Sequence, residues 1–351
     1  MNFFNKHSFF YTLCFLIIFN FILDQNPHNN IYISDNFPKL NYQNLLIGIF
    51  MLAIFSFNSY LKVAGRKGWG QYVRQEGLKT HLKKTGTPTA AGWIFFVMSI
   101  VPLCIFLPNF LMNKNILWVP LLAITVMFLT GLMDDLYKIK GTKEGLLARY
   151  RLLAQFLVGS LLGYYFLPWD LYTNIVVGFL LFGTAVNGIN FTDGSDGLLA
   201  AVILATPIGL LILYAISQIM GIGFPIVSSK FVFVLLGLLM LSWIPFNKYP
   251  AKLFMGETGS YTIGAIVGFV AIYSLQSEPI ITFLLLSVPI LQIATVVIQV
   301  FFYKKFGRRV FLMAPFHHHL EKKGWSENKI AYSAFFFQLL LTVSLIGSVT
   351  Y

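Results

Sequence analysis

The sequence predicts an all-α membrane protein that crosses the bilayer about ten times, and three observations support this class. Of its 351 residues, 57% are hydrophobic and only 11% are charged, whereas an ordinary soluble domain carries about 25% charged residues. The apolar residues fall in runs of roughly 18 to 25 residues, the length that a helix needs to cross about 30 Å of hydrocarbon. Because these runs do not alternate between apolar and polar residues, helices fit them better than a transmembrane barrel does.

Ten apolar runs form the predicted core. They cover approximately residues 43–63, 89–108, 116–133, 152–168, 171–188, 197–217, 231–246, 258–275, 279–303 and 330–350. The loops between them are too short for a separate soluble domain, so residues 43–351 are expected to form one membrane domain. Residues 1–42 precede it and contain a further apolar run at 9–23. That run resembles a signal segment but lacks a small-residue cleavage site, so we expect a retained short helix, either interfacial or an additional span.

The basic residues predict the orientation of the bundle. A net charge of +12 would also suit nucleic-acid binding, but 21 of the 25 Lys and Arg residues lie in loops on one face of the predicted bundle. The positive-inside rule places that face in the cytoplasm. We therefore expect no nucleic-acid partner, a surrounding lipid membrane, and both ends of the ten-span core on the periplasmic side.

Acidic residues at the cytoplasmic ends of two spans form the first candidate site. Asp134 and Asp135 end one span, and Glu257 stands where a later span begins. Adjacent carboxylates repel one another unless a cation is near, and Mg²⁺ commonly links one or two carboxylates to substrate phosphates. Two alternatives stay open: a solvated acidic helix end beside Lys138, and Glu257 acting only as a favourable charge at a helix N-terminus.

Two further loops on the same face carry polar residues in patterns that suit a ligand. Residues 187–197 combine two Asn and two Asp with three Gly, which offers hydrogen-bond donors and acceptors to a sugar or base, although an Asx-rich turn would look similar. Residues 81–92 place basic side chains beside a Gly/Pro/Thr segment, which suits a diphosphate but lacks the P-loop spacing. Membrane anchoring explains part of that basic charge.

Three consecutive histidines, His317, His318 and His319, lie in the last cytoplasmic loop. Neighbouring positions cannot all converge on one ligand from a single helix face. Their titration near neutral pH also suits phosphate binding or proton handling. The sequence leaves both uses open.

These segments, in this order, resemble the polyprenyl-phosphate N-acetylhexosamine-1-phosphate transferases over about residues 60 to 350. The histidine segment at 313–325 and the Lys-x-Gly-Thr-Pro-Thr loop at 84–89 are most similar to the phospho-N-acetylmuramoyl-pentapeptide transferase branch. The resemblance implies a Mg²⁺-dependent enzyme that joins undecaprenyl phosphate to UDP-MurNAc-pentapeptide and yields lipid I and UMP. It also implies an active site on the cytoplasmic face of the bacterial inner membrane.

The resemblance assigns roles to individual residues. The catalytic residues that it implies are Asp134, Asp135, Glu257, His317, His318 and His319, with the metal held by Asp135 and Glu257 and close to Asp134. The substrate-binding residues that it implies are Lys84, Thr89, Lys138, Arg151, Asn187, Asn190, Asp193, Asp196, Asn247 and Phe254. Among these, Lys84, Lys138 and Arg151 are expected near phosphate, and Phe254 is expected to stack on uracil.

Several positions depart from the family pattern, and several alternatives stay open. Glu257 stands where the family usually has Asp, which allows reduced activity or an altered metal preference. Arg151 stands where Lys is expected and keeps the charge with a different hydrogen-bond geometry, and residues 89–92 and Ser195 also replace more usual residues. A sister enzyme acting on UDP-GlcNAc would share the metal and nucleoside motifs. A transporter would place its polar groups near mid-membrane rather than at one face. A non-catalytic relative and a homodimer also remain open.

Overall fold

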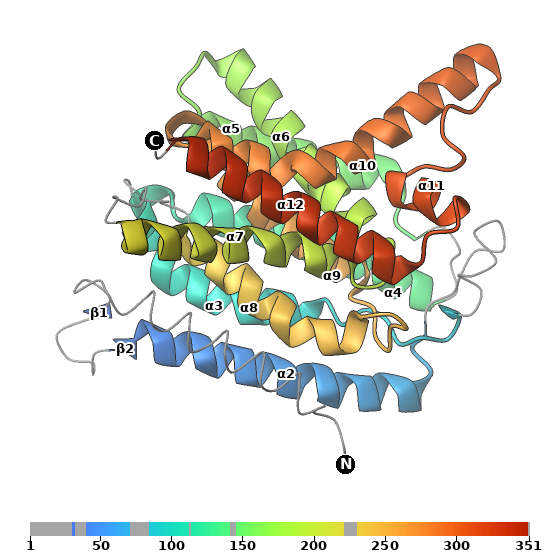
Figure 1. Cartoon of the computed structure of the whole chain (residues 1–351), viewed down its shortest axis with the longest axis horizontal. Coiled ribbons are helices and arrows are strands. Elements are labelled where there is room, and N and C mark those ends of the chain that lie inside the picture. Colours follow the sequence, from blue (N-terminus) through green and yellow to red (C-terminus); the bar gives the residue numbers. More distant parts are fainter. Residues whose placement is uncertain are drawn as a thin grey trace.

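The computed structural model describes residues 30–31, 40–70, 84–111, 114–140, 145–220 and 230–349. Helices make up nearly all of this part of the chain (Figure 1). The helices are α2 (Tyr42–Lys67), α3 (Trp93–Phe110), α4 (Trp118–Ile139), α5 (Ala148–Phe166), α6 (Leu171–Thr192), α7 (Leu198–Met220), α8 (Lys230–Asn247), α9 (Gly256–Ser277), α10 (Pro279–Phe306), α11 (Phe316–Lys322), α12 (Glu327–Val349) and the short 3₁₀ helix η2 (Lys114–Ile116). Two-residue strands β1 (Asn30–Ile31) and β2 (Leu40–Asn41) pair antiparallel before α2.

Ten helices in the described ranges are 18 to 28 residues long, and they correspond in order to the ten predicted apolar runs. Six of them, α2, α4, α6, α7, α9 and α10, contain segments long and apolar enough to cross a membrane, and α3 and α8 contain shorter apolar helices. The all-α, multi-pass class is therefore confirmed. The orientation of the bundle stays a prediction, and the expected helix at 9–23 lies outside the described residues.

Helix α9 lies at the centre of the bundle and is buried along most of its length. It packs against α3, α4, α5, α6 and α10. Glycine permits the closest of these approaches: a Cβ atom added to Gly92, just before α3, would lie 1.9 Å from the backbone nitrogen of Gly259. Only a residue without a side chain fits there, and this contact fixes the depth of the α9 N-terminus in the bundle.

Aromatic residues fill the interior between α2, α3 and α8. Phe57, Phe95 and Trp243 are fully buried, and their ring centroids lie 4.9 to 5.4 Å apart. Such spacing suits tilted and edge-to-face aromatic pairs. Burial of each large apolar side chain contributes about 1.5–3 kcal/mol in water-based measurements; in a bilayer, packing rather than water exclusion supplies most of the gain.

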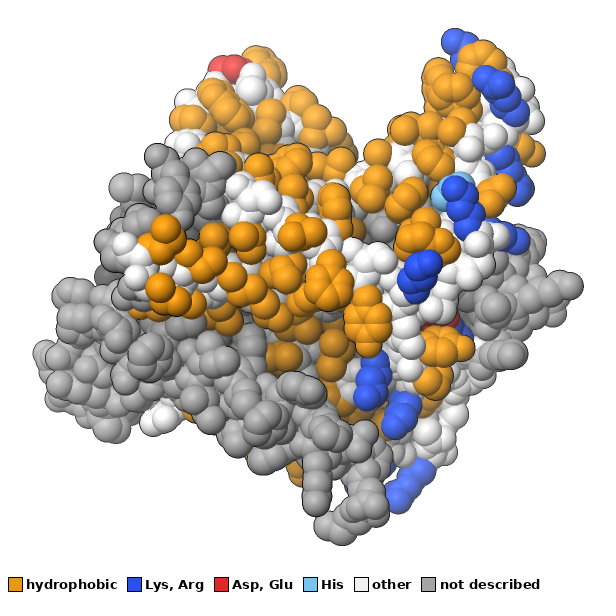
Figure 2. All heavy atoms as spheres, in the orientation of Figure 1, with side chains coloured by type: hydrophobic (Ala, Val, Ile, Leu, Met, Phe, Trp, Pro, Cys, Tyr) orange, Lys and Arg blue, Asp and Glu red, His pale blue; other side chains and the backbone are white. Residues whose placement is uncertain are grey.

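The outer surface divides into an apolar region and a basic end. Figure 2 shows hydrophobic side chains over α7 and α12, and Lys and Arg side chains gathered at the end of the molecule where α11 lies. Exposed apolar residues such as Met51, Leu157 and Leu340 lie on helices that face outward. A continuous apolar surface with charge at one end is expected of a protein that sits in a bilayer.

Candidate active site

Three carboxylates from two helices meet at the basic end of the bundle. Asp134 and Asp135 lie near the C-terminus of α4, and Glu257 lies in the first turn of α9. One oxygen from each residue lies within 4.8 Å of the others. Asp134 and Asp135 are 0% and 3% exposed, whereas Glu257 is partly exposed. The predicted proximity of Asp135 and Glu257 is therefore confirmed, while the roles of these residues stay a prediction.

Asp135 joins α4 to the N-terminus of α9. Its Oδ2 accepts hydrogen bonds from the Thr258 backbone N–H at 2.9 Å and from Thr258 Oγ1 at 2.5 Å, and its Oδ1 accepts from the Glu257 N–H at 3.1 Å. The first N–H groups of a helix lack partners within it and favour a negative charge. Gly256 adopts a φ of +70°, and a Cβ atom there would lie 2.4 Å from Asp135 Oδ2, so the carboxylate reaches the helix end because residue 256 is glycine.

Two basic side chains face the same carboxylates. Lys138 Nζ lies 2.7 Å from Asp134 Oδ2 and also contacts Glu257 Oε1. Arg151, at the start of α5, places Nη1 3.9 Å from Asp134 Oδ1 and donates to the Tyr261 hydroxyl at 3.3 Å. Three acidic and two basic groups leave one excess negative charge, which suits an additional cation.

The donor set fits a divalent metal ion. All three carboxylates offer hard oxygen ligands, the type that Mg²⁺ takes, and their oxygens already lie within 4.8 Å of one another. The ammonium group of Lys138 lies between Asp134 and Glu257. The cluster therefore already holds one positively charged group.

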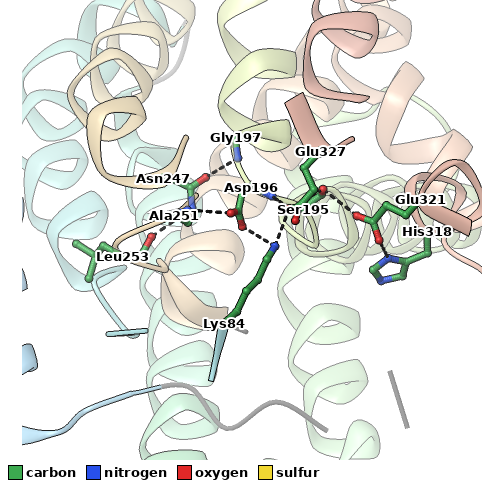
Figure 3. A network of polar contacts seen from close by, with 10 residues as sticks. All are labelled: Lys84, Ser195, Asp196, Gly197, Asn247, Ala251, Leu253, His318, Glu321 and Glu327. Carbon is green, nitrogen blue, oxygen red and sulfur yellow. Dashed lines mark hydrogen bonds and ion pairs between the residues drawn. The ribbon is translucent and has the colours of Figure 1, made fainter. Parts of the chain in front are cut away.

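Figure 3 shows a second polar network, which includes the loop that follows α6. Lys84 Nζ lies 2.6 Å from Asp196 Oδ1 and 2.6 Å from Glu327 Oε2. The Ala251 N–H donates to Asp196 Oδ2 at 2.8 Å. The N–H of Gly197, which follows Asp196, donates to Asn247 Oδ1 at 3.0 Å. Segments from four parts of the chain therefore converge on the loop that follows α6.

Charge in this network shifts two pKa values. Burial lowers the pKa of Lys84, but the carboxylates of Asp196 and Glu327 outweigh burial and raise it above its ordinary value. Burial raises the pKa of Asp193 well above its ordinary value, and the charges of Glu257, Asp196 and Asp135 add to this shift. Carboxylates of both clusters therefore act on the pKa of Asp193.

The three histidines point in different directions, as their adjacency predicted. His317 is buried, and its Nδ1 lies 3.1 Å from Gln292 Oε1. His318 Nδ1 lies 2.9 Å from Glu321 Oε2, whereas His319 Nδ1 accepts from the backbone N–H of residue 312 at 3.1 Å. His317 lies against the loop that follows α6, because a Cβ atom on Gly194 would lie 2.6 Å from His317 Nε2.

The other predicted substrate-binding residues fall into two groups. Asn190 faces the site: its Oδ1 accepts from Ser260 Oγ at 2.8 Å, one turn into α9. The amide of Asn187 instead pairs with Gln155, with bonds of 2.7 Å and 3.2 Å between α6 and α5. This pairing occupies the Asn187 side chain within the bundle.

Phe254 and Thr89 belong to a backbone pairing beside the Lys84 loop. The Phe254 N–H donates to the Pro88 carbonyl at 2.8 Å, and the Phe254 carbonyl accepts from the N–H of Ala91 at 3.2 Å. The Thr89 carbonyl accepts from the Tyr60 hydroxyl at 2.7 Å, and Thr89 is buried. The pairing brings Phe254, which is partly buried, close to the segment that carries Lys84.

Comparison with known proteins gives the family. The family described as "Glycosyl transferase family 4" matches residues 117–275, which contain all three clustered carboxylates. The chain is 36% identical over 319 residues to the phospho-N-acetylmuramoyl-pentapeptide-transferase of Caldanaerobacter subterraneus subsp. tengcongensis, covering 85% of this chain and 95% of the relative. It is 32% identical over 317 residues to that of Dictyoglomus thermophilum (85% and 96%) and 30% identical over 298 residues to that of Clostridium acetobutylicum (80% and 90%).

The chain belongs to the phospho-N-acetylmuramoyl-pentapeptide-transferase family. The predicted resemblance is thereby confirmed, and with it the prediction of a membrane-embedded transferase. A phospho-N-acetylmuramoyl-pentapeptide-transferase handles phosphate groups, and phosphoryl transfer depends mainly on positioning and on stabilisation of charge. Lys138, Arg151 and the three carboxylates supply charged groups of both signs for that chemistry.

The sequence analysis did not identify every polar residue of the candidate site. Glu327, the first residue of α12, contacts Lys84 and Asp196, and Glu321 links His318 to Ser195, whose Oγ donates to Glu321 Oε1 at 3.0 Å. One signal was present in the sequence: an acidic residue on the basic face, at the start of a span. Its partners lie more than 100 residues away along the chain, so only the folded structure identifies them.

Proposed function

We propose that this protein transfers phospho-MurNAc-pentapeptide from UDP-MurNAc-pentapeptide to undecaprenyl phosphate and thereby forms lipid I and UMP. The observation that carries the proposal is the meeting of Asp134, Asp135, Glu257 and Lys138 at one end of α4 and α9. It occurs in a chain that aligns with 95% of a phospho-N-acetylmuramoyl-pentapeptide-transferase at 36% identity. In the reaction, the lipid phosphate oxygen forms a bond to the sugar-side phosphorus, the bond between the two phosphates breaks, and UMP leaves.

The active site is proposed to open to the cytoplasm of a bacterium, with the helices in its inner membrane. Two features support this orientation. Basic residues gather at the end of the molecule that carries α11 (Figure 2), and such residues are enriched in cytoplasmic loops. UDP-linked substrates are soluble, so a site at that end is reached without crossing the bilayer.

Mg²⁺ is the proposed metal, held by Asp135 and Glu257 with Asp134 beside them. When bound, it would neutralise negative charge on the diphosphate. The side chains of the cluster prepare the site for this ion. Asp135 is fixed by the N-terminus of α9, and Lys138 stabilises both Asp134 and Glu257 from the side.

Lys138 and Arg151 are proposed to stabilise the transferring phosphate. Both cations lie at Asp134, at 2.7 Å and 3.9 Å from its carboxylate oxygens. Asp134 is also fixed by the backbone N–H of residue 146, which donates to its Oδ1 at 2.8 Å. Asp134 therefore holds the two cations in place, and the transferring phosphate is proposed to bind them. Direct attack and a covalent aspartyl intermediate are both compatible with this arrangement.

The second network is proposed to bind the nucleoside, together with Asn190, Asp193, Asn247 and Phe254. Lys84 contacts two carboxylates at 2.6 Å each. These carboxylates can hydrogen-bond to an uncharged base or ribose, and Lys84 is proposed to face the adjoining phosphate, as the resemblance in sequence implies.

One reconstitution tests the proposal. The purified protein is placed in lipid nanodiscs with undecaprenyl phosphate, Mg²⁺ and either UDP-MurNAc-pentapeptide or UDP-GlcNAc, and both UMP and the lipid product are measured. We expect UMP and lipid I from the first substrate only. Turnover of UDP-GlcNAc alone would show that the protein has the sister activity. Turnover of neither substrate would contradict the proposed function.

A further inference from the structure

We infer that Glu327 is a positioning residue for nucleotide binding: it holds Lys84 and the Asp196 loop in the arrangement that receives the nucleotide. The inference rests on the proposed function, because it gives Glu327 a task at the proposed nucleoside site. Glu327 is remote in sequence from every segment that it touches.

One oxygen of Glu327 gathers three donors from two other segments. Glu327 Oε2 accepts from Lys84 Nζ at 2.6 Å, from the Asp196 backbone N–H at 2.8 Å and from Ser195 Oγ at 3.1 Å. Figure 3 shows Lys84, Ser195 and Asp196 around the Glu327 side chain. A charged acceptor makes stronger hydrogen bonds than a neutral one, so this oxygen fixes both segments relative to α12.

The position of Glu327 is itself well fixed. It is the first residue of α12 and is 9% exposed. Ser326 precedes it and accepts from the Lys329 backbone N–H at 3.3 Å, in the manner of an N-cap. A carboxylate in the first helical turn is stabilised by the helix dipole. Because α12 packs along α7, Glu327 is held by a long helix pair rather than by a loop.

Loss of the Glu327 charge should loosen the site without unfolding the loop. Asp196 retains Lys84 and the Ala251 N–H as partners, and Gly197 retains Asn247. Glutamine has nearly the same shape as glutamate, and its carbonyl oxygen can still accept from the Asp196 N–H. The substitution therefore removes chiefly the charge that orients Lys84.

The test compares Glu327→Gln with the wild type and with Glu278→Gln as a matched control. Glu278 follows α9 at the end opposite Glu257, about 32 Å away at 1.5 Å per helical residue. Each protein is assayed in nanodiscs for kcat, for the KM of UDP-MurNAc-pentapeptide, and for the KM of undecaprenyl phosphate. UMP binding without turnover and thermal stability are measured on the same preparations.

We expect Glu327→Gln to raise the nucleotide KM and the Kd of UMP in parallel by about 10-fold, the effect of losing one charge-assisted contact. The kcat and the KM of the lipid should change less than about 2-fold. Glu327→Asp should recover part of the UMP affinity, and Lys84→Met combined with Glu327→Gln should cost less than the sum of the two single changes. Glu278→Gln should match the wild type.

Three results would overturn the inference: unchanged UMP affinity in Glu327→Gln, equal losses in kcat and in both KM values, or additive effects of the two substitutions. The UMP measurement needs no turnover. An inactive wild type that still binds UMP, with weaker binding in Glu327→Gln, would contradict the proposed reaction while supporting the role of Glu327. An active wild type with unchanged UMP affinity in Glu327→Gln would support the proposed reaction and contradict the role of Glu327.

Discussion

Gly131 of α4 lies directly against the backbone carbonyl of Glu257 in α9: a Cβ atom added to Gly131 would lie 2.4 Å from that oxygen. The contact sits one turn before Asp134 and Asp135, on the same helix. A backbone atom cannot move aside for an added Cβ atom as the end of a flexible side chain can. The absence of a side chain at Gly131 therefore allows the carboxylates of α4 to lie this close to the carboxylate of α9.

Gly131→Ala is expected to separate α4 from α9 and to lower activity together with stability. Overpacking of a tight interior typically costs about 1–3 kcal/mol. Thermal unfolding in detergent and UMP release measure the two effects. Gly65→Ala in α2 is the control, because a Cβ atom there meets nothing within 4 Å and alanine favours a helix. Full activity in Gly131→Ala would show that the helix spacing does not govern the site.

Asp135→Asn is expected to reduce UMP release by about 100-fold or more, the scale seen when one preorganised electrostatic contact is lost from an active site. Asparagine keeps the shape but removes the charge that a metal requires. Mg²⁺ should also raise the melting temperature of the wild type, because ligands that bind only the folded state stabilise it, and this rise should vanish in the variant. Undiminished turnover would refute the metal role of Asp135.

Asp170→Asn serves as the control for that experiment. Asp170 precedes α6 and accepts from the backbone N–H groups of Tyr172 and Thr173 at 3.1 Å, and asparagine is an equally good N-cap. It lies at the opposite end of α6 from Asp193. Activity and the response to Mg²⁺ should both match the wild type.

Asp193→Asn is expected to make the protein more stable at pH 7. The pKa of Asp193 is raised in the folded state, first by burial and then by neighbouring carboxylates, so the folded protein binds its proton more tightly than the unfolded chain does. Stability therefore falls as pH rises from the unfolded pKa, about 3.9, through the folded pKa. Asparagine does not titrate, so the variant escapes this loss.

The stability difference between Asp193→Asn and the wild type should consequently shrink as pH is lowered. It should disappear below about pH 4, where both states of the wild type are protonated. Thermal melts in detergent at a series of pH values measure it. A constant difference across pH would show that the substitution acts through packing and not through charge.

Gln155 and Asn187 are expected to act as one unit in the contact between α5 and α6. Each side chain donates to the other, and Gln155 is fully buried. Replacement of either by leucine removes the partner of the other amide, which costs about 1–3 kcal/mol, whereas the double variant should cost less than the sum. A nucleotide KM that rises in Asn187→Leu but not in Gln155→Leu would instead support substrate binding by Asn187.

The sequence was sufficient for the class of fold and for much of the candidate site. The ten predicted runs correspond to the ten long helices of the described residues. A bilayer requires continuous apolar segments, and the length and composition of each run are visible in the sequence. Asp134, Asp135 and Glu257 stood out because charge at a span end is expensive without a partner. Their convergence followed from their placement on one face of the bundle.

Partners across the bundle could not be predicted in the same way. Three such contacts join residues that are 32 or more positions apart in the sequence: the amide pair of Asn187 with Gln155, the contact of Lys84 with Glu327, and the hydrogen bonds of Asp135 to the N-terminus of α9. The same sequence pattern is compatible with a substrate contact or with a structural one. Only the direction of each side chain distinguishes the two.

The sequence alone determined that this protein is a bundle of membrane helices with acidic, amide and histidine groups at one basic end, because lipid excludes unpaired charge and positive loops stay on one side. The tertiary structure decided which groups touch. Close glycine contacts such as Gly92 against Gly259 set the depth of α9, and that depth brings Glu257 to Asp135. Packing distances between helices depend on the shapes of both surfaces, and no single stretch of sequence contains both.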